Sequence, residues 1–329
     1  MAPRDALYFF WQWEEAPVKR DLLSLADVTP AEIEYLLTLA SKLKQRQKTG
    51  LMPPFLEGKT LALLFHKQSL RTRTSFEVGM HQLGGFTTYI HDQEIGIGTR
   101  EPVKDLARVL SRYYDGIVLR TFAHDIVVEL AAYATVPVIN GLTDLLHPCQ
   151  ILSAMLALRE HFGRLKGLRI AYIGDGNNVA NSWLLGAAQM GLALTIACPR
   201  GYQPDADIRS QAEQIAETTG AMLDIVEDPH QAVKGVDAVY TDVWTSMGQE
   251  DEAEARRRDF QAYQINEALM AEAPSHSVVM HCLPAHRGEE ITDAVFESSR
   301  SLVFEEAENR LHAQKALLAF LMAPETQIT

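Results

Sequence analysis

The sequence is poor in the features that mark secreted and membrane-spanning proteins. It contains only three cysteines, Cys149, Cys198 and Cys282, among 329 residues. They are odd in number and far apart, which excludes a disulfide framework and favours a reducing compartment. No apolar run approaches the ~18–20 residues that a membrane span needs. We therefore expect a cytoplasmic protein.

Positive charge is also scarce. The chain has 30 Lys and Arg against 43 Asp and Glu, a net charge of −13. An acidic chain without a polybasic run is poorly suited to nucleic acid or to an anionic membrane surface, so we expect neither as a partner. With 47% hydrophobic and 22% charged residues, the composition is typical of a soluble globular protein.

The N-terminal segment, residues 1–18, lacks the features of a targeting signal. Its aromatic stretch is followed by Glu14 and Glu15, and no small-residue cleavage site is present. A mitochondrial leader would be rich in Arg and poor in acidic residues. We interpret this segment as a soluble extension.

Strand and helix patterns alternate along the rest of the chain. Thr29, Pro30 and Glu32 form a capping box that predicts the start of a helix. Strands are predicted at 60–65, 87–90, 116–120 and 136–140, and again at 169–173, 194–198, 236–240 and 278–280. This alternation predicts an α/β fold with two doubly wound parallel-sheet domains. We place the domains at 19–150 and 151–308, followed by a final helix at 309–323.

Two segments of the first domain have the chemistry of an anion site. Residues 69–73, Ser-Leu-Arg-Thr-Arg, follow a predicted strand and open a helix. There, backbone N–H groups, the helix dipole and forked arginines favour phosphate. Arg120 ends another predicted strand. His147-Pro-Cys-Gln150 stands just before the helix that joins the two domains.

A turn at residues 174–179 resembles a dinucleotide-binding loop, but two features argue against a nicotinamide cofactor. Val179 stands in place of the third glycine, and no acid follows about 20 residues on to hold a ribose. The paired Asn177 and Asn178 instead offer uncharged hydrogen bonds to a polar small molecule.

Two further strand ends carry reactive side chains. Asp242 follows one strand and precedes Ser246-Met247-Gly248, and its carboxylate can pair with an amine. Cys282 follows the last strand, where a cysteine either lines a pocket or acts as a nucleophile. His281 and Cys282 are adjacent, unlike structural zinc ligands, so we expect no metal.

Together these motifs resemble the aspartate/ornithine carbamoyltransferase superfamily, in order, over residues 19–322. Residues 69–73 resemble its carbamoyl phosphate loop, and residues 147–150 match its H-P-x-Q motif. Asp242 with Ser246-Met-Gly248 resembles the loop of the ornithine branch, and residues 281–284 match that branch's H-C-L-P.

The resemblance implies an active site in the cleft between the two domains, with the final helix packed back on the first domain. It implies transfer of the carbamoyl group of carbamoyl phosphate to the δ-amine of L-ornithine, giving L-citrulline and phosphate in arginine metabolism. It also implies a homotrimer or a multiple of trimers, and no cofactor. Citrulline synthesis and citrulline phosphorolysis use the same residues, so both directions stay open.

The resemblance also assigns site residues, which fall into three sets. The residues implied to bind carbamoyl phosphate are Ser69, Leu70, Arg71, Thr72, Arg120, His147, Gln150, Cys282, Leu283 and Arg310. Those implied to bind ornithine are Asn178, Asp242, Ser246 and Met247. Those implied to be catalytic are Arg120, His147, Asp242 and Cys282.

The sequence departs from the family pattern at two places. Leu70 stands where Thr is common, although backbone N–H groups can serve there. Ile95-Gly96 stands where the family often has a Ser-Gln pair that reaches a neighbouring subunit's phosphate site. Gln93 and Arg100 are the candidates to replace that pair.

The residues in these loops also distinguish this function from others. An aspartate-specific enzyme should carry basic groups in place of Asp242 and residues 246–248. A putrescine or N-acylornithine enzyme should change that loop too, and this remains the main alternative. A catalytically dead paralogue is disfavoured by the intact set of Arg71, Arg120, His147, Asp242, Cys282 and Arg310.

Overall fold

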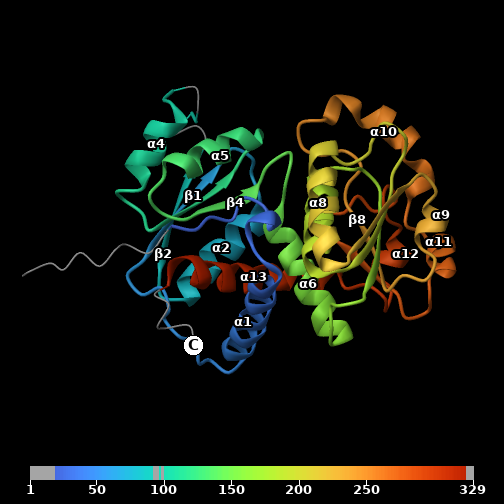
Figure 1. Ribbon diagram of the computed structural model, residues 1–329, viewed down its shortest axis with the longest axis horizontal. Coiled ribbons are helices and arrows are strands. Elements are labelled where there is room, and N and C mark those ends of the chain that lie inside the picture. Colours follow the sequence, from blue (N-terminus) through green and yellow to red (C-terminus); the bar gives the residue numbers. More distant parts are fainter. Residues whose placement is uncertain (1–18, 92–95, 98–99, 324–329) are drawn as a thin grey trace, which may run out of the picture.

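The computed structural model describes residues 19–91, 96–97 and 100–323. The described chain forms two α/β halves side by side, each built around one parallel sheet (Figure 1). This confirms the predicted fold class. The N-terminal extension at 1–18 lies outside the described residues.

The first half contains a four-stranded sheet in the order β2-β1-β3-β4. Its strands are β1 (Thr60–Phe65), β2 (Phe86–His91), β3 (Gly116–Arg120) and β4 (Val138–Leu142). Its helical segments are η1 (Leu25–Asp27), α1 (Pro30–Lys48), α2 (Leu70–Gln82), α4 (Val103–Leu110) and α5 (His124–Tyr133). All strand pairs in the sheet are parallel.

The second half contains a five-stranded parallel sheet in the order β7-β6-β5-β8-β9. Its strands are β5 (Arg169–Ile173), β6 (Ala193–Ala197), β7 (Met222–Val226), β8 (Ala238–Thr241) and β9 (Val278–His281). Its helical segments are α7 (Asn178–Met190), α8 (Ala206–Thr219), α9 (Pro229–Ala232), η2 (Glu250–Glu252), α10 (Ala253–Asp259), η3 (Gln261–Tyr263), α11 (Glu267–Glu272) and α12 (Asp293–Phe296).

Most element predictions agree with the structure, and the differences have local causes. Thr29 caps α1 through the predicted capping box. Strand β4 begins at Val138 rather than at residue 136, because Pro137 has no N–H to donate to a neighbouring strand. Strand β7 was not predicted. It lies at the edge of the sheet and none of its five side chains is fully buried, so its hydrophobic pattern is weak.

Two long helices join the halves. Helix α6 (Pro148–Phe162) packs against α13 (Val303–Met322), and α13 also contacts α1 and α2 (Figure 1). One buried hydrophobic cluster runs from Leu61 of the first sheet through Ile151 of α6 to Trp183 of α7. Helix α13 begins at Val303 rather than at the predicted residue 309.

The topology fixes where a ligand can bind. In the first sheet the chain passes from β1 to β2 on one side and then returns to β3 on the other. In the second sheet it passes from β5 to β6 and β7 and returns to β8 on the other side of β5. Ligands of such sheets bind beyond the carboxyl ends of the strands at these reversals. The loops after β1, β3, β5 and β8 are therefore the expected site.

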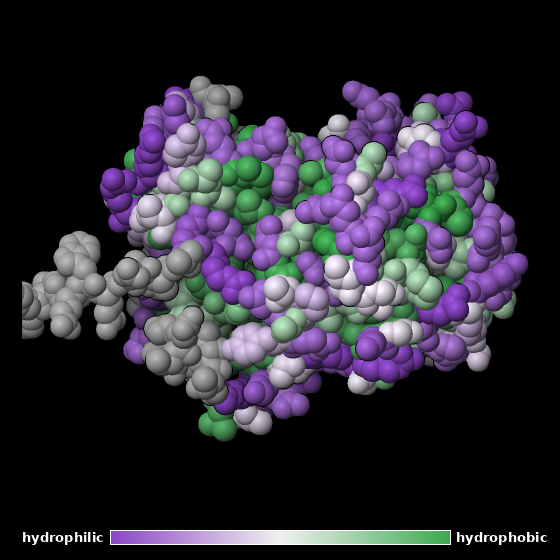
Figure 2. Space-filling model, in the orientation of Figure 1, coloured by the Kyte–Doolittle hydropathy of each residue, from purple (hydrophilic) through white to green (hydrophobic). Residues whose placement is uncertain are grey.

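The surface agrees with the composition. The face drawn in Figure 2 is largely hydrophilic, with hydrophobic atoms visible between the two halves. None of the helices within the described ranges combines the length and the apolarity that a membrane crossing requires.

Candidate functional site

A cleft of about 1110 Å³ lies between the two halves and receives the loops from both sheets. Its walls include every predicted site residue except Thr72. The predicted residues that line it are Ser69, Leu70, Arg71, Arg120, His147, Gln150, Asn178, Asp242, Ser246, Met247, Cys282, Leu283 and Arg310. Residues far apart in the sequence thus meet in one cavity.

Thr72 is fully buried behind the wall, where its hydroxyl accepts hydrogen bonds from two arginines. Arg310 Nη2 lies 2.6 Å from Thr72 Oγ1, and Arg120 Nη1 lies 3.4 Å from it. Ser69 caps α2 and accepts from the Thr72 N–H at 3.2 Å. Thr72 therefore holds the guanidinium groups from behind, while Leu70 is 77% exposed at the start of the helix.

The first wall of the cleft is a cluster of arginines that lacks a counter-charge. Among the described residues, Arg71, Arg120 and Arg310 make no ion pair with a carboxylate. Burial, together with the charges of Arg310 and Arg71, lowers the pKa of Arg120 to about 9. Such a cluster favours an anion between its members, because the anion offsets their mutual repulsion.

His147 and Gln150 line the cleft beside this cluster; His147 is the N-cap residue just before α6, as predicted, whereas Gln150 already lies on its first turn. His147 is buried, and burial with the nearby Arg310 and Arg120 holds its pKa well below the usual range. The imidazole is therefore neutral, and its Nδ1 is unpaired. Gln150 donates from Nε2 to Glu306, and its own Oε1 is unpaired.

The second wall carries a thiol and a carboxylate in contact. Cys282 Sγ lies 2.7 Å from Asp242 Oδ1, and Asp242 also accepts from the Val243 N–H at 2.8 Å. Burial, reinforced by the Asp242 charge, raises the pKa of the Cys282 thiol well above its usual value. Cys282 is therefore a neutral thiol that donates to Asp242, and a reactive thiolate is disfavoured.

Asn177, which the sequence predicts to offer hydrogen bonds to a small molecule, instead binds the Asp242 carboxylate. Its Nδ2 donates to Asp242 Oδ2 at 2.8 Å, and its Oδ1 caps α7. The predicted ligand residue Asn178 instead uses its Nδ2 on the carbonyl oxygen of Thr143 at 2.6 Å, across the two halves. The sequence signal for this role of Asn177 is an N-cap residue at the start of α7, four residues after β5 ends.

The segment after Cys282 has an unusual backbone. Leu283 has a φ of 59° and precedes Pro284 through a cis peptide bond. The Leu283 N–H donates to His281 Nδ1 at 2.9 Å, while His281 Nε2 contacts Glu290 Oε1 at 2.9 Å. Both imidazole nitrogens are therefore occupied, although potential ligand atoms of Asp242, His281 and Cys282 lie within 4.8 Å of one another.

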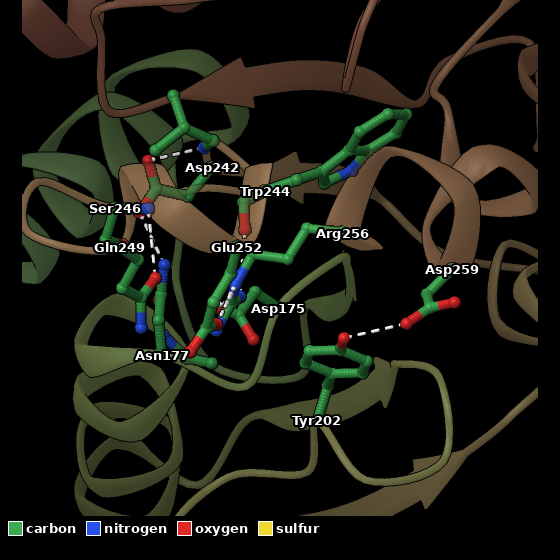
Figure 3. A network of polar contacts seen from close by, with 12 residues as sticks. Asp175, Asn177, Tyr202, Asp242, Trp244, Ser246, Gln249, Glu252, Arg256 and Asp259 are labelled. Atoms are coloured by element: carbon green, nitrogen blue, oxygen red, sulfur yellow. Dashed lines mark hydrogen bonds and ion pairs between the residues drawn. The ribbon is translucent and has the colours of Figure 1, made fainter. Parts of the chain in front are cut away.

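The loop that carries Ser246 and Met247 is anchored by a buried arginine (Figure 3). Arg256 Nη1 contacts Asp175 Oδ2 at 3.0 Å and the carbonyl oxygen of Trp244 at 2.9 Å. Arg256 stands in a run of charged residues at 250–258, but it turns inward because Asp175 lies buried beneath it. Despite this pairing, burial raises the pKa of Asp175 to about 6.

Lys67 is a cleft residue that sequence reasoning missed. Its ammonium group pairs with Asp144 and lies 4.2 Å from the centre of the Phe122 ring. It stands two residues before Ser69 and lines the same cleft as the arginine cluster. Gln93 and Ile95 lie outside the described residues, whereas Gly96 accepts a backbone hydrogen bond from Arg100 at 2.8 Å.

Fold and site together define a two-sheet α/β protein whose interdomain cleft pairs an anion-binding arginine cluster with a thiol–carboxylate pair. A family model for the carbamoyl-P binding domain of aspartate/ornithine carbamoyltransferase matches residues 20–160. A model for the Asp/Orn binding domain of the same family matches residues 166–321.

Similar proteins agree with this match. An ornithine carbamoyltransferase from Carboxydothermus hydrogenoformans is 52% identical, over 92% of this chain and 97% of that protein. A solved ornithine carbamoyltransferase from Pyrococcus furiosus superposes with a TM-score of 0.90 at 50% identity, over 93% and 97% of the two chains. One from Gloeobacter violaceus superposes with a TM-score of 0.83 at 49% identity, over 94% and 100%. The chain belongs to the aspartate/ornithine carbamoyltransferase family.

Replacing Arg256 with Met should destabilise the protein, because it leaves the Asp175 carboxylate buried without its partner. Breaking a buried ion pair on one side costs about 3–5 kcal/mol, and urea denaturation would measure the loss. Arg257→Met is the matched control, since it removes only an exposed pair with Glu289 and should cost under about 1 kcal/mol. Equal losses for the two variants would contradict this interpretation of Arg256.

Replacing Asp242 with Asn should make Cys282 easier to alkylate. Removing the carboxylate charge lowers the pKa of the Cys282 thiol, so a larger fraction of it is thiolate. The rate is measured near pH 8, because an ordinary thiol has a pKa of about 8.5. We expect a severalfold faster reaction of Cys282 with iodoacetamide, followed by peptide mass spectrometry. Cys149 is the internal control, because Asp242 is not among the groups that shift its pKa. An unchanged rate at Cys282 would refute the electrostatic coupling.

Proposed function

We propose that this protein transfers the carbamoyl group of carbamoyl phosphate to the δ-amine of L-ornithine, forming L-citrulline and phosphate. One observation carries the proposal. An unpaired cluster of Arg71, Arg120 and Arg310 shares one cleft with the Asp242–Cys282 pair. The first group suits an acyl donor that carries a phosphate, and the second suits an amine acceptor. The curated relatives are ornithine carbamoyltransferases by name.

The donor is held by the first half of the cleft. The N-terminus of α2, with Ser69, Leu70, Arg71 and Thr72, binds the phosphate through backbone N–H groups and guanidinium charge. Arg120, His147, Gln150 and Arg310 surround the carbamoyl group, together with the backbone of Cys282 and Leu283. No metal or organic cofactor takes part in this proposal.

The acceptor enters from the second half, where Asn178, Asp242, Ser246 and Met247 bind ornithine. Its δ-ammonium has a reference pKa of about 10.4, so only ~10⁻³ to 10⁻⁴ is neutral at pH 7. Desolvation beside the neutral Cys282 thiol and the positive field of the arginine cluster both favour the neutral amine. Asp242 already accepts hydrogen bonds from three residues. It therefore orients ornithine, and does little to stabilise the charged form of the reacting δ-amine.

The chemical step is then an acyl transfer. The δ-nitrogen attacks the carbamoyl carbon, and the carbonyl electron pair moves onto oxygen to give a tetrahedral oxyanion. The δ-nitrogen gives up its extra proton to the departing phosphate, and collapse of the intermediate re-forms the carbonyl group and breaks the bond to the phosphate oxygen. Arg120 and the neutral His147 stabilise the oxyanion, while Arg71 holds the charge of the departing phosphate.

Several wider assignments accompany the reaction. We place the carbamoyl phosphate domain at 19–150, with the helix over residues 309–323 packed back on it, and the ornithine domain at 151–308. We further propose a cytoplasmic homotrimer, or a multiple of trimers, acting in arginine biosynthesis. Small molecules are its substrates, and nucleic acid and membranes are not partners. The alternative acceptors are putrescine and N-acylornithine.

The reaction is tested by supplying carbamoyl phosphate with L-ornithine, and in parallel with putrescine, N-acetylornithine and aspartate. We expect turnover with ornithine alone, measured as citrulline formed, because Asp242 and the loop at 246–248 suit a free α-amino acid. Turnover with another amine instead would replace the acceptor while keeping the carbamoyl donor. Absence of turnover with every amine would overturn the proposed function.

The oxyanion role is tested at Arg120. We expect Arg120→Ala to lower kcat by ~10²–10³, the usual loss on removing such a donor. Arg209→Ala is the matched control, since Arg209 is exposed on α8, pairs with Glu213 and does not line the cleft. A kcat for Arg120→Ala within tenfold of the wild type would refute the role of Arg120.

A further inference from the structure

A buried carboxylate on α13 lies directly behind the cleft wall. Glu306 is fully buried, one helical turn before Arg310. Its Oε1 accepts from Gln150 Nε2 at 2.7 Å and from the Tyr240 hydroxyl at 2.6 Å, and its Oε2 is unpaired. Glu306 does not line the cleft, whereas Gln150 does.

This contact decides which way the Gln150 side-chain amide faces. A carboxylate oxygen without a proton only accepts hydrogen bonds, so Glu306 Oε1 can meet only the NH2 group of Gln150 and never its carbonyl oxygen. Because both donors share Oε1, any proton on the carboxyl group belongs on Oε2. A proton on Oε2 leaves this orientation of Gln150 unchanged.

The orientation of the Gln150 amide also fixes the position of its carbonyl oxygen. With Nε2 held by Glu306, Gln150 Oε1 points away from Glu306 and has no partner, although it is buried. A buried carbonyl oxygen without a partner is costly, and it is satisfied by a ligand that brings an N–H group. The arginines around it, Arg120 and Arg310, offer only donors to the same ligand.

We propose that Glu306 is a positioning residue, which locks the Gln150 amide so that its carbonyl oxygen reads the NH2 group of the acyl phosphate donor. The lock makes the site select carbamoyl phosphate over an isosteric acyl phosphate that carries a methyl group, such as acetyl phosphate. This inference rests on the proposed function for its donor and is independent of the amine acceptor.

Burial raises the pKa of Glu306 to about 7, while the hydrogen bonds from Tyr240 and Gln150 and the charges of His281 and Arg310 oppose that rise. These four residues come from β8, α6, β9 and α13. The Oε1 atom of the carboxyl group is thus held by donors from α6 and β8, which suits a residue that fixes an orientation.

The experiment compares two stable ligands that differ only in this group. Phosphonoacetamide carries NH2 where 2-oxopropylphosphonate carries CH3, and isothermal titration calorimetry gives the dissociation constant of each without an amine present. We expect the wild type to prefer the amide by about tenfold or more, the value of one buried hydrogen bond whose loss leaves an oxygen unpaired. In Glu306→Gln the preference should fall severalfold, because the introduced amide group can both donate and accept and so permits both orientations of Gln150.

Matched variants separate positioning from stability. Glu308→Gln removes the same charge two residues along α13, where Glu308 pairs with Lys44 near the surface, and should keep the preference. Gln150→Ala should abolish the preference, and adding Glu306→Gln to it should change nothing further. If Glu306→Gln does not fold, Glu306→Asp gives the same test, since its carboxylate is set back from Gln150 by one methylene.

Each outcome either supports or overturns the role of Glu306. A lower preference in the Glu306 variants, with Glu308→Gln unchanged, supports the proposal. Equal weakening of both ligands, an unchanged ratio, or a wild type that binds both ligands alike overturns it while leaving the phosphate site in place. A wild type that binds neither ligand overturns the proposed function itself, and the positioning role with it.

Discussion

The packing of α13 against α6 is the contact on which the site depends. Helix α13 returns from the second half and lies against α1, α2 and α6. Its first turns thereby carry Arg310 to Thr72 of the first half and Glu306 to Gln150. If this packing were lost, the arginine cluster would lose one of its three members, and Gln150 would lose the carboxylate that orients it.

The arginine cluster depends on the buried contacts around it. Burying several positive charges without carboxylate partners destabilises a protein, since each guanidinium loses its hydration and no ion pair compensates for that loss. Here the Thr72 hydroxyl and the surrounding core hold the groups in place. An anionic substrate supplies the opposite charge, so part of its binding energy comes from relieving the mutual repulsion of these arginines, and its binding stabilises the fold.

In the opposite wall of the cleft, the thiol is neutral and the carboxylate has its hydrogen bonds satisfied within the protein. The Asp242 carboxylate is surrounded by donors from Asn177, Val243 and Cys282. Its charge is therefore partly neutralised within the protein, and the thiol beside it stays protonated. A cationic half that binds an anion and a second half that tolerates a neutral amine are what an acyl transfer from a phosphate to an amine requires.

The fold class, most strands and helices, and the segments that meet in the cleft could all be predicted from the sequence. Those features depend on local signals, such as the capping box at Thr29 and hydrophobic runs at strand length. The roles of Asn177, Lys67 and Glu306 and the inward turn of Arg256 could not. These side chains act on partners that are distant in the sequence, and no local pattern encodes which of two neighbouring polar residues will face inward. Their pairings follow from the tertiary structure, because it alone sets which strand ends and helix faces come within hydrogen-bonding reach.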